Sequence, residues 1–151
     1  MTGLLDDAQI ERLLRSEWIG RLGCHARERT YVVPVTYVYD GTAIYGQTGK
    51  GLKIEMMREN PKVCFEIDHS PDIASWESVI VHGRYEELQD EAADAAVATL
   101  IGRLSKLRTS EGRTPPHGAG RIEVGTEDAG PRVEIVYRIV VDERSGRFEH
   151  A

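Results

Sequence analysis

Residues 31–67 read YVVPVTYVYDGTAIYGQTGKGLKIEMMRENPKVCFEI, and this stretch decides the fold. Two runs rich in β-branched and aromatic residues flank Asp40-Gly41, a dipeptide typical of a hairpin turn. A turn with two glycines follows, and then a short basic helix that Asn60-Pro61 stops. Another apolar, β-rich run comes next. The predicted elements are strands at 31–39, 42–47 and 62–68 and a helix at 51–59.

The turn at 47–53 has the chemistry of a phosphate site. Its glycines let the backbone approach a ligand closely, and the Thr48 hydroxyl can donate to an oxygen. A helix beginning near Gly51 offers unpaired N–H groups and the positive end of its dipole. The dipole disfavours a cation such as Lys53 in the first turn by about 0.3–1 kcal/mol, and a bound phosphate would reverse that sign. Lys50 adds a second cation. The alternative is an ordinary solvated surface helix.

Composition is that of one soluble domain over residues 1–151, with 40% hydrophobic and 29% charged residues. The net charge of −6 argues against nucleic-acid binding, and no apolar run is long enough for a membrane span. The first residues lack the features of a secretion signal, so we expect a cytoplasmic protein. Cys24 and Cys64 are then expected to be free thiols, and no cysteine or histidine spacing indicates a metal site.

Hydrophobic periodicity predicts the remaining elements. The strand at 76–88 is apolar on both faces, so we expect it at the centre of the sheet. A long segment at 109–131, dense in Gly, Pro, Thr and Glu, is expected to be a functional loop, a disordered one or an oligomer contact. About six antiparallel strands with peripheral helices are typical of a barrel. The other predicted elements are a helix capped by Asp6 or Asp7, a helix at 90–107, strands at 18–24 and 132–141, a short strand at 146–149 and a loop at 69–75.

Four segments carry a resemblance to a known family: YVVPVTYVY, IYGQT, GLKIEMMRENPKVCFEID and WESVIVHGRYEEL. In this order they resemble the pyridoxamine 5′-phosphate oxidase-like FMN-binding split-barrel flavoproteins. Within that family they are most similar to the branch that includes the nitroimidazole-resistance proteins. The similarity covers residues 4–105 and, more weakly, the last strand. It implies a mainly β fold, a six-stranded antiparallel split barrel, and a homodimer with two FMN sites at its interface.

The resemblance also implies the residues that bind FMN. Lys53 would hold the phosphate, and the strand segment at 33–36 would run along the isoalloxazine ring. Gln47 would lie near the ribityl chain, and Ser78 would flank the site. Trp76 either shields the flavin or fills core. The complete expected set is Val33, Pro34, Val35, Thr36, Gln47, Thr48, Lys50, Gly51, Leu52, Lys53, Trp76 and Ser78.

Two departures from the family bear on the activity. Relatives of nitroreductase type often carry histidine where this chain has Gln47, and an amide cannot titrate near neutral pH. Pyridoxamine phosphate oxidases carry Arg then Lys at the positions of Leu52 and Lys53, so oxidation of vitamin B6 is not expected. We expect an FMN-dependent oxidoreductase acting on a small organic acceptor. The alternatives are a deazaflavin-dependent reductase of the same fold and a non-catalytic flavin-binding or sensor protein.

Overall fold

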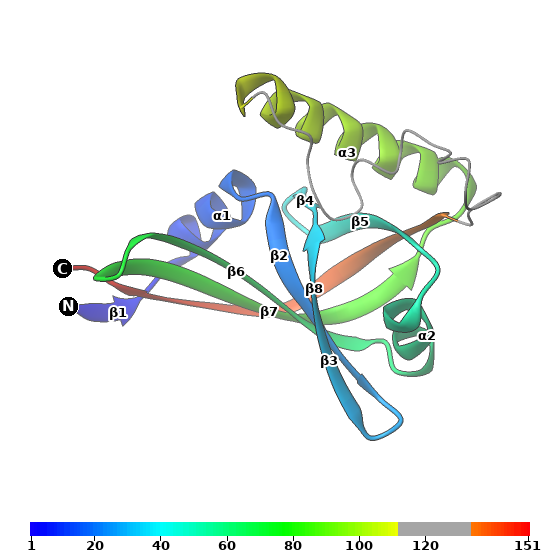
Figure 1. The fold of residues 1–151 in the computed structure, drawn as a ribbon, viewed down its shortest axis with the longest axis horizontal. Helices are drawn as coiled ribbons and strands as arrows, with labels where there is room; N and C mark the ends of the chain where they lie inside the picture. The colour runs from blue at the N-terminus through cyan, green and yellow to red at the C-terminus, as the bar shows by residue number, and fades with distance from the viewer. Residues whose placement is uncertain (112–133) are drawn as a thin grey trace.

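The computed structural model describes residues 1–111 and 134–151, and Figure 1 shows a strongly twisted antiparallel sheet with helices around it. The sheet order is β3-β2-β6-β7-β8-β5-β4, and β1 pairs with β8. The predicted fold class is confirmed. The elements are β1 (Thr2–Leu4), α1 (Asp7–Ser16), β2 (Ile19–Ala26), β3 (Arg29–Thr36), β4 (Val38–Tyr39), β5 (Ala43–Gly49), α2 (Leu52–Glu59), β6 (Lys62–Asp72), β7 (Ser75–Glu87), α3 (Asp90–Glu111) and β8 (Glu134–Glu149).

The barrel interior is filled by one apolar face of each long strand, including Leu22, Phe65, Val81 and Ile139, each at most 1% exposed. Asp6, one of the two caps that the sequence predicted, is the N-cap of α1, and its carboxylate accepts from Gln9 N in a capping box. Helix α2 packs on β2, and α3 packs on β5 and β8. No helix in the described ranges is long and apolar enough to cross a membrane.

The single strand predicted at 31–39 is wrong, because the chain changes partners at Tyr37. β3 pairs with β2 along its whole length, whereas β4 pairs with β5. Tyr37 N donates to Trp18 O at 3.1 Å, and its hydroxyl donates to Leu14 O at 2.8 Å. These bonds tie Tyr37 to α1 and to the short connection between α1 and β2. Because β3 and β4 are the two ends of the sheet path, the chain itself joins the two edges of the barrel.

The predicted loop at 69–75 is also wrong. β6 and β7 continue as a hairpin beyond the barrel and pair out to Asp72 and Ser75. Pro71 fits there because β2 pairs with β6 only at residues 64–66. No second strand therefore needs a hydrogen bond from the N–H group that proline lacks.

The last two predicted strands are one strand, β8, which spans Glu134–Glu149. Its polar middle, residues 142–145, has no apolar alternation that would indicate a strand, and it is held by pairing with β7. The predicted loop at 109–131 begins inside α3, which runs to Glu111, and its remainder lies outside the described residues.

Candidate functional site

The barrel is split between β3 and β5. Val38 pairs with Tyr45 and Tyr39 with Ile44, and the same register would place Thr36 opposite Gln47. Instead β3 turns away to β2, so among the described residues no strand pairs with β5 at 46–49 on that side. Beyond Val38 and Tyr45 the two strands therefore diverge, and the region between residues 33–36 and residues 47–48 is called the wedge below. Val35 and Thr36 are buried at its closed end, and Pro34 is exposed.

The turn that follows β5 carries the predicted anion site to the wedge. Gly51 is the N-cap of α2 and makes no side-chain hydrogen bond to the helix, so no cap side chain occupies the N–H groups of the first turn. Leu52 and Lys53 are half-buried, and Lys50 is exposed. The helix therefore presents its positive end without a capping side chain, with two lysines beside it.

Arg58, in the last turn of the same helix, is held by a carboxylate. Arg58 Nη2 donates to Glu87 Oε2 at 3.1 Å, and the Tyr85 hydroxyl donates to Glu87 Oε1 at 2.9 Å. The hydrogen bond from Arg58 lowers the pKa of Glu87, although burial opposes it, and the nearby charge of Lys50 lowers it further. Glu87 therefore lies close to the turn, and Arg58 is neutralised by it.

Lys53 lies close to the thiol of Cys24 on β2. Burial raises the pKa of this thiol, and the charge of Lys53 opposes that shift. Burial and the carboxylate of Glu66 raise the pKa of Cys64. Both cysteines are free, as predicted, and both are held as neutral thiols near pH 7, which makes them poor nucleophiles.

Two acceptor oxygens at this edge of the sheet have no hydrogen-bond donor among the described residues. They are Oε1 of Gln47 and Oε2 of Glu134, and both are buried. Gln47 pairs with Val136 and Gly49 with Glu134, so the two side chains are diagonal neighbours on one face, about 7–8 Å apart at their Cα atoms. Burial without a donor is costly, so this pair suits a ligand that brings hydroxyl or N–H groups. The sequence offered no signal for Glu134.

Trp76 and Ser78 lie at the opposite end of β7 from the turn. Trp76 Nε1 donates to Glu149 Oε2 at 3.2 Å, and Ser78 Oγ donates to Glu66 Oε2 at 3.1 Å. Glu87, which lies beside the turn, is about 30 Å further along the strand than Ser78, at about 3.3 Å per residue. One chain therefore brings together the predicted residues of 33–36 and 47–53 but not Trp76 or Ser78.

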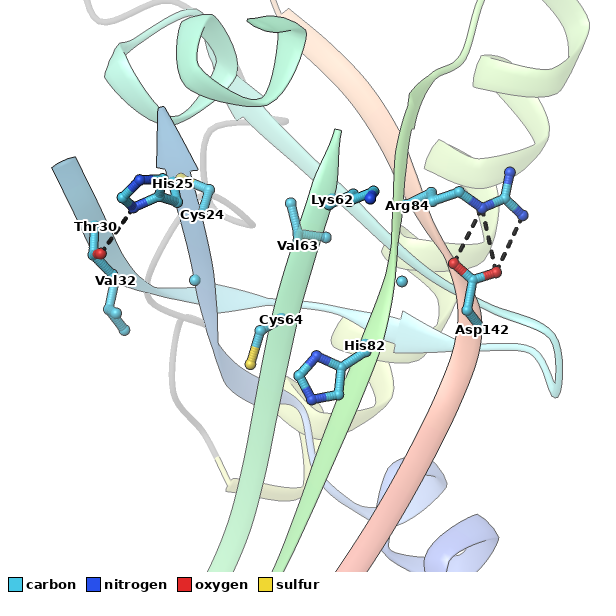
Figure 2. A pocket seen from close by; sticks show the side chains of 12 residues that line it. Cys24, His25, Thr30, Val32, Lys62, Val63, Cys64, His82, Arg84 and Asp142 are labelled. Atoms are coloured by element: carbon cyan, nitrogen blue, oxygen red, sulfur yellow. Dashed lines mark hydrogen bonds and ion pairs between the residues drawn. The ribbon is translucent and has the colours of Figure 1, made fainter. Parts of the chain in front are cut away.

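The outer face of β2, β6 and β7 carries a groove that sequence reasoning missed. Its volume is about 510 Å³, and Figure 2 shows Cys64 and His82 on its floor. Gly23, Cys64 and His82 are directly paired across three strands. Cys24 also borders the groove, but its side chain is buried in the core, on the opposite face of β2. The described residues contain no cluster of three or more His, Cys, Asp or Glu that could hold a metal.

Comparison with known proteins agrees with this architecture. The family model for pyridoxamine 5′-phosphate oxidase matches residues 6–148. An uncharacterized protein of Rhizobium meliloti is 33% identical over 129 residues, which are 85% of this chain and 83% of that protein.

Solved structures give the same result. A FAD-binding protein from Mesorhizobium loti is 28% identical with a TM-score of 0.76, covering 100% of this chain and 98% of that one. A candidate 5-nitroimidazole antibiotic resistance protein from Bacteroides thetaiotaomicron, 21% identical, shares the fold with a TM-score of 0.72, covering 98% of this chain and 87% of that one. The chain therefore belongs to the pyridoxamine 5′-phosphate oxidase family, as the segments within residues 31–88 predicted.

Proposed function

We propose that this protein binds a flavin, with its ring system in the wedge between β3 and β5 and its phosphate at the turn before α2. The proposal rests on the position of the end of the wedge. It ends at the N-terminus of α2, which has no capping side chain, beside Lys50 and Lys53. A flat ring fits between two strand edges, and a phosphate fits a helix N-terminus with cations next to it. The ribityl hydroxyls would supply donors for Gln47 Oε1 and Glu134 Oε2.

FMN is the flavin that we propose, because the turn provides one phosphate site. FAD is the second candidate, since the Mesorhizobium loti relative is named as FAD-binding. Mass spectrometry of the cofactor released from purified protein decides between FMN, FAD and a deazaflavin. A protein that neither purifies with a flavin nor binds one on titration would refute the proposal.

We further propose an oxidoreductase. A bound flavin supplies the electron chemistry, and the protein supplies binding, orientation and exclusion of water. Residues 33–36 and Gln47 would orient the ring, and the turn would hold the phosphate. Neither thiol is a nucleophile at neutral pH, because the pKa of each is raised. Reduction of the bound flavin by a reduced nicotinamide, followed by reoxidation by an organic acceptor, would support an enzyme. Flavin binding without turnover would support a carrier or sensor.

A homodimer is part of the same proposal. Trp76 and Ser78 lie toward the end of β7 that is away from Glu87 and the turn, so a site that uses both groups of residues would combine two chains. In a two-fold dimer each of two equivalent sites would receive Trp76 and Ser78 from the partner chain.

Gln47 provides a test of the reactive site. The amide cannot change its charge between about pH 5 and 8, so activity should have no pH dependence from this position. Gln47→His should introduce a pH dependence of activity, with an apparent pKa of about 6.5. Burial would lower the pKa of this histidine, and the carboxylate of Glu134 would raise it. The measurement is a pH–rate profile of both proteins at full flavin occupancy, with Gln47→Met as the non-titrating control. Identical profiles for all three would place Gln47 outside the reactive site.

A further inference from the structure

Asn60 lies where two strands of the sheet separate. β2 and β6 pair at residues 21–23 and 64–66, and the same register continued by two residues would place His25 opposite Lys62. Those two residues do not pair in the described structure, and Figure 1 shows the β2–β3 hairpin projecting away from β6 beyond this point. Asn60 follows the last residue of α2 and precedes β6, so it stands beside the gap between the two strands.

The side-chain amide of Asn60 takes the place of the missing strand pairing. Its Oδ1 accepts from Lys62 N at 3.2 Å, in a turn that asparagine side chains commonly form, and its Nδ2 donates to His25 O at 2.8 Å. Its backbone N–H donates to Met56 O at 2.9 Å and so ends α2. One residue thus joins the end of α2 to both β2 and β6. The Asn60-Pro61 signal in the sequence predicted the end of the helix but not this bridge.

Other contacts also hold α2, but they fix its position less precisely. Three of its side chains are buried in the core, each at most 1% exposed, and apolar burial is strong but has no preferred direction. Arg27 Nη2 lies 2.6 Å from Glu59 Oε2, but both side chains are about half exposed, and such ion pairs contribute little. The hydrogen bonds of Asn60 are directional, so they determine where the end of α2 lies along β2.

Both halves of the proposed flavin site are attached to β2. The strand β3, which carries residues 33–36, pairs with β2 along its whole length. Helix α2 carries Lys53 and the N-cap Gly51, and it is a single rigid piece of about 12 Å at 1.5 Å per residue. A displacement of its last turn therefore moves the phosphate site relative to the ring site.

We propose that Asn60 is a positioning residue of the flavin site, an inference that rests on the proposed function. Its amide fixes the helix that holds the phosphate on the strand that supports the ring site, and so sets the distance between the two sites. FMN gains affinity from its phosphate only if both sites are engaged at once, and that gain depends on how well the sites are preorganised. Riboflavin has no phosphate and needs only the ring site. Loss of the Asn60 bridge should therefore weaken FMN binding and spare riboflavin.

Two variants of Asn60 test this inference. Asn60→Ala removes both side-chain hydrogen bonds. Asn60→Ser keeps a hydroxyl that can accept from Lys62 N, but it has no amide to reach His25 O. In titration calorimetry, each variant should bind FMN about three- to tenfold more weakly than wild type, the loss expected for one hydrogen bond, and should bind riboflavin with unchanged affinity.

Gln9→Ala is the matched control, because Gln9 Oε1 accepts from Asp6 N at 2.8 Å in the capping box of α1. This variant loses a side-chain amide at the end of another helix, so it should lower stability while the ratio of the riboflavin Kd to the FMN Kd stays unchanged. Hydrogen exchange of the apoprotein gives a readout without flavin. The amides of α2 and of residues 24–31 should exchange faster in both Asn60 variants, whereas in Gln9→Ala the faster amides should be those of α1.

Three results would overturn the inference. An equal loss of FMN and riboflavin affinity would mean that Asn60 supports the fold in general. A wild-type FMN affinity of Asn60→Ser would mean that the local turn with Lys62 is sufficient, and unchanged exchange of α2 in both variants would mean that the bridge does not hold the helix. A wild type that binds neither compound would instead count against the proposed function, and faster exchange in Asn60→Ser would then still support the link between α2 and β2.

Discussion

Lys53→Ala should weaken flavin binding by about ten- to a hundredfold, because the variant loses a charge-assisted hydrogen bond to the phosphate worth roughly 1.5–3 kcal/mol. Lys53 lies in the first turn of α2, and Gly51 provides no capping side chain there. Without a ligand the helix dipole disfavours this cation, so the apoprotein should lose little stability. Titration calorimetry of flavin into apoprotein measures the first effect, and thermal unfolding of the apoprotein measures the second.

Two controls sharpen this prediction. Lys106→Ala removes an exposed lysine from α3 and should leave the flavin affinity unchanged. Riboflavin, which has no phosphate, should bind wild type and Lys53→Ala with similar affinity, because it cannot use the lysine. If Lys53→Ala bound FMN as tightly as wild type, the phosphate would lie elsewhere and the carry-over of this turn from the family would fail.

The sequence predicted those parts of the molecule that local chemistry determines. The Asp40-Gly41 turn, the glycines before α2 and Asn60-Pro61 fix element ends within a few residues of chain, and the structure has β5, α2 and β6 in that order. The division between β3 and β4 depends instead on bonds from Tyr37 to Trp18 and Leu14, which lie about 20 residues away. No local pattern reports such bonds.

The candidate site divides in the same way. The residues of the turn are neighbours in sequence, so their proximity could be predicted from it. The distance of Ser78 from the turn is set by the length and pairing of β7, and the place of Glu134 is set by its pairing with Gly49 on β5. Both depend on the register of strands far apart in the chain, which one sequence does not reveal.

Phe65→Ala should lower the free energy of unfolding by about 3–5 kcal/mol, the usual loss for a buried phenylalanine. The Phe65 ring is 1% exposed and meets Tyr37 edge to face, with centroids 5.1 Å apart and an angle of 75°. It lies over Gly20, where an added Cβ would come within 2.3 Å of the ring. Because Gly20 has no side chain, little can move into the cavity that Phe65→Ala leaves. Urea unfolding at constant protein concentration measures the loss.

The same ring holds the wedge in shape, because Tyr37 is the residue at which the chain passes from β3 to β4. A double-mutant cycle with Gly20→Ala tests this contact directly. Alone, Gly20→Ala should destabilise, since its methyl group would overlap the Phe65 ring. In the Phe65→Ala background the same methyl group fills part of the cavity, so Gly20→Ala should become neutral or stabilising. Additive losses would mean that the ring does not fill the space above Gly20. A reversal of sign, with flavin affinity reduced in Phe65→Ala, would mean that one packed ring positions both strands of the wedge.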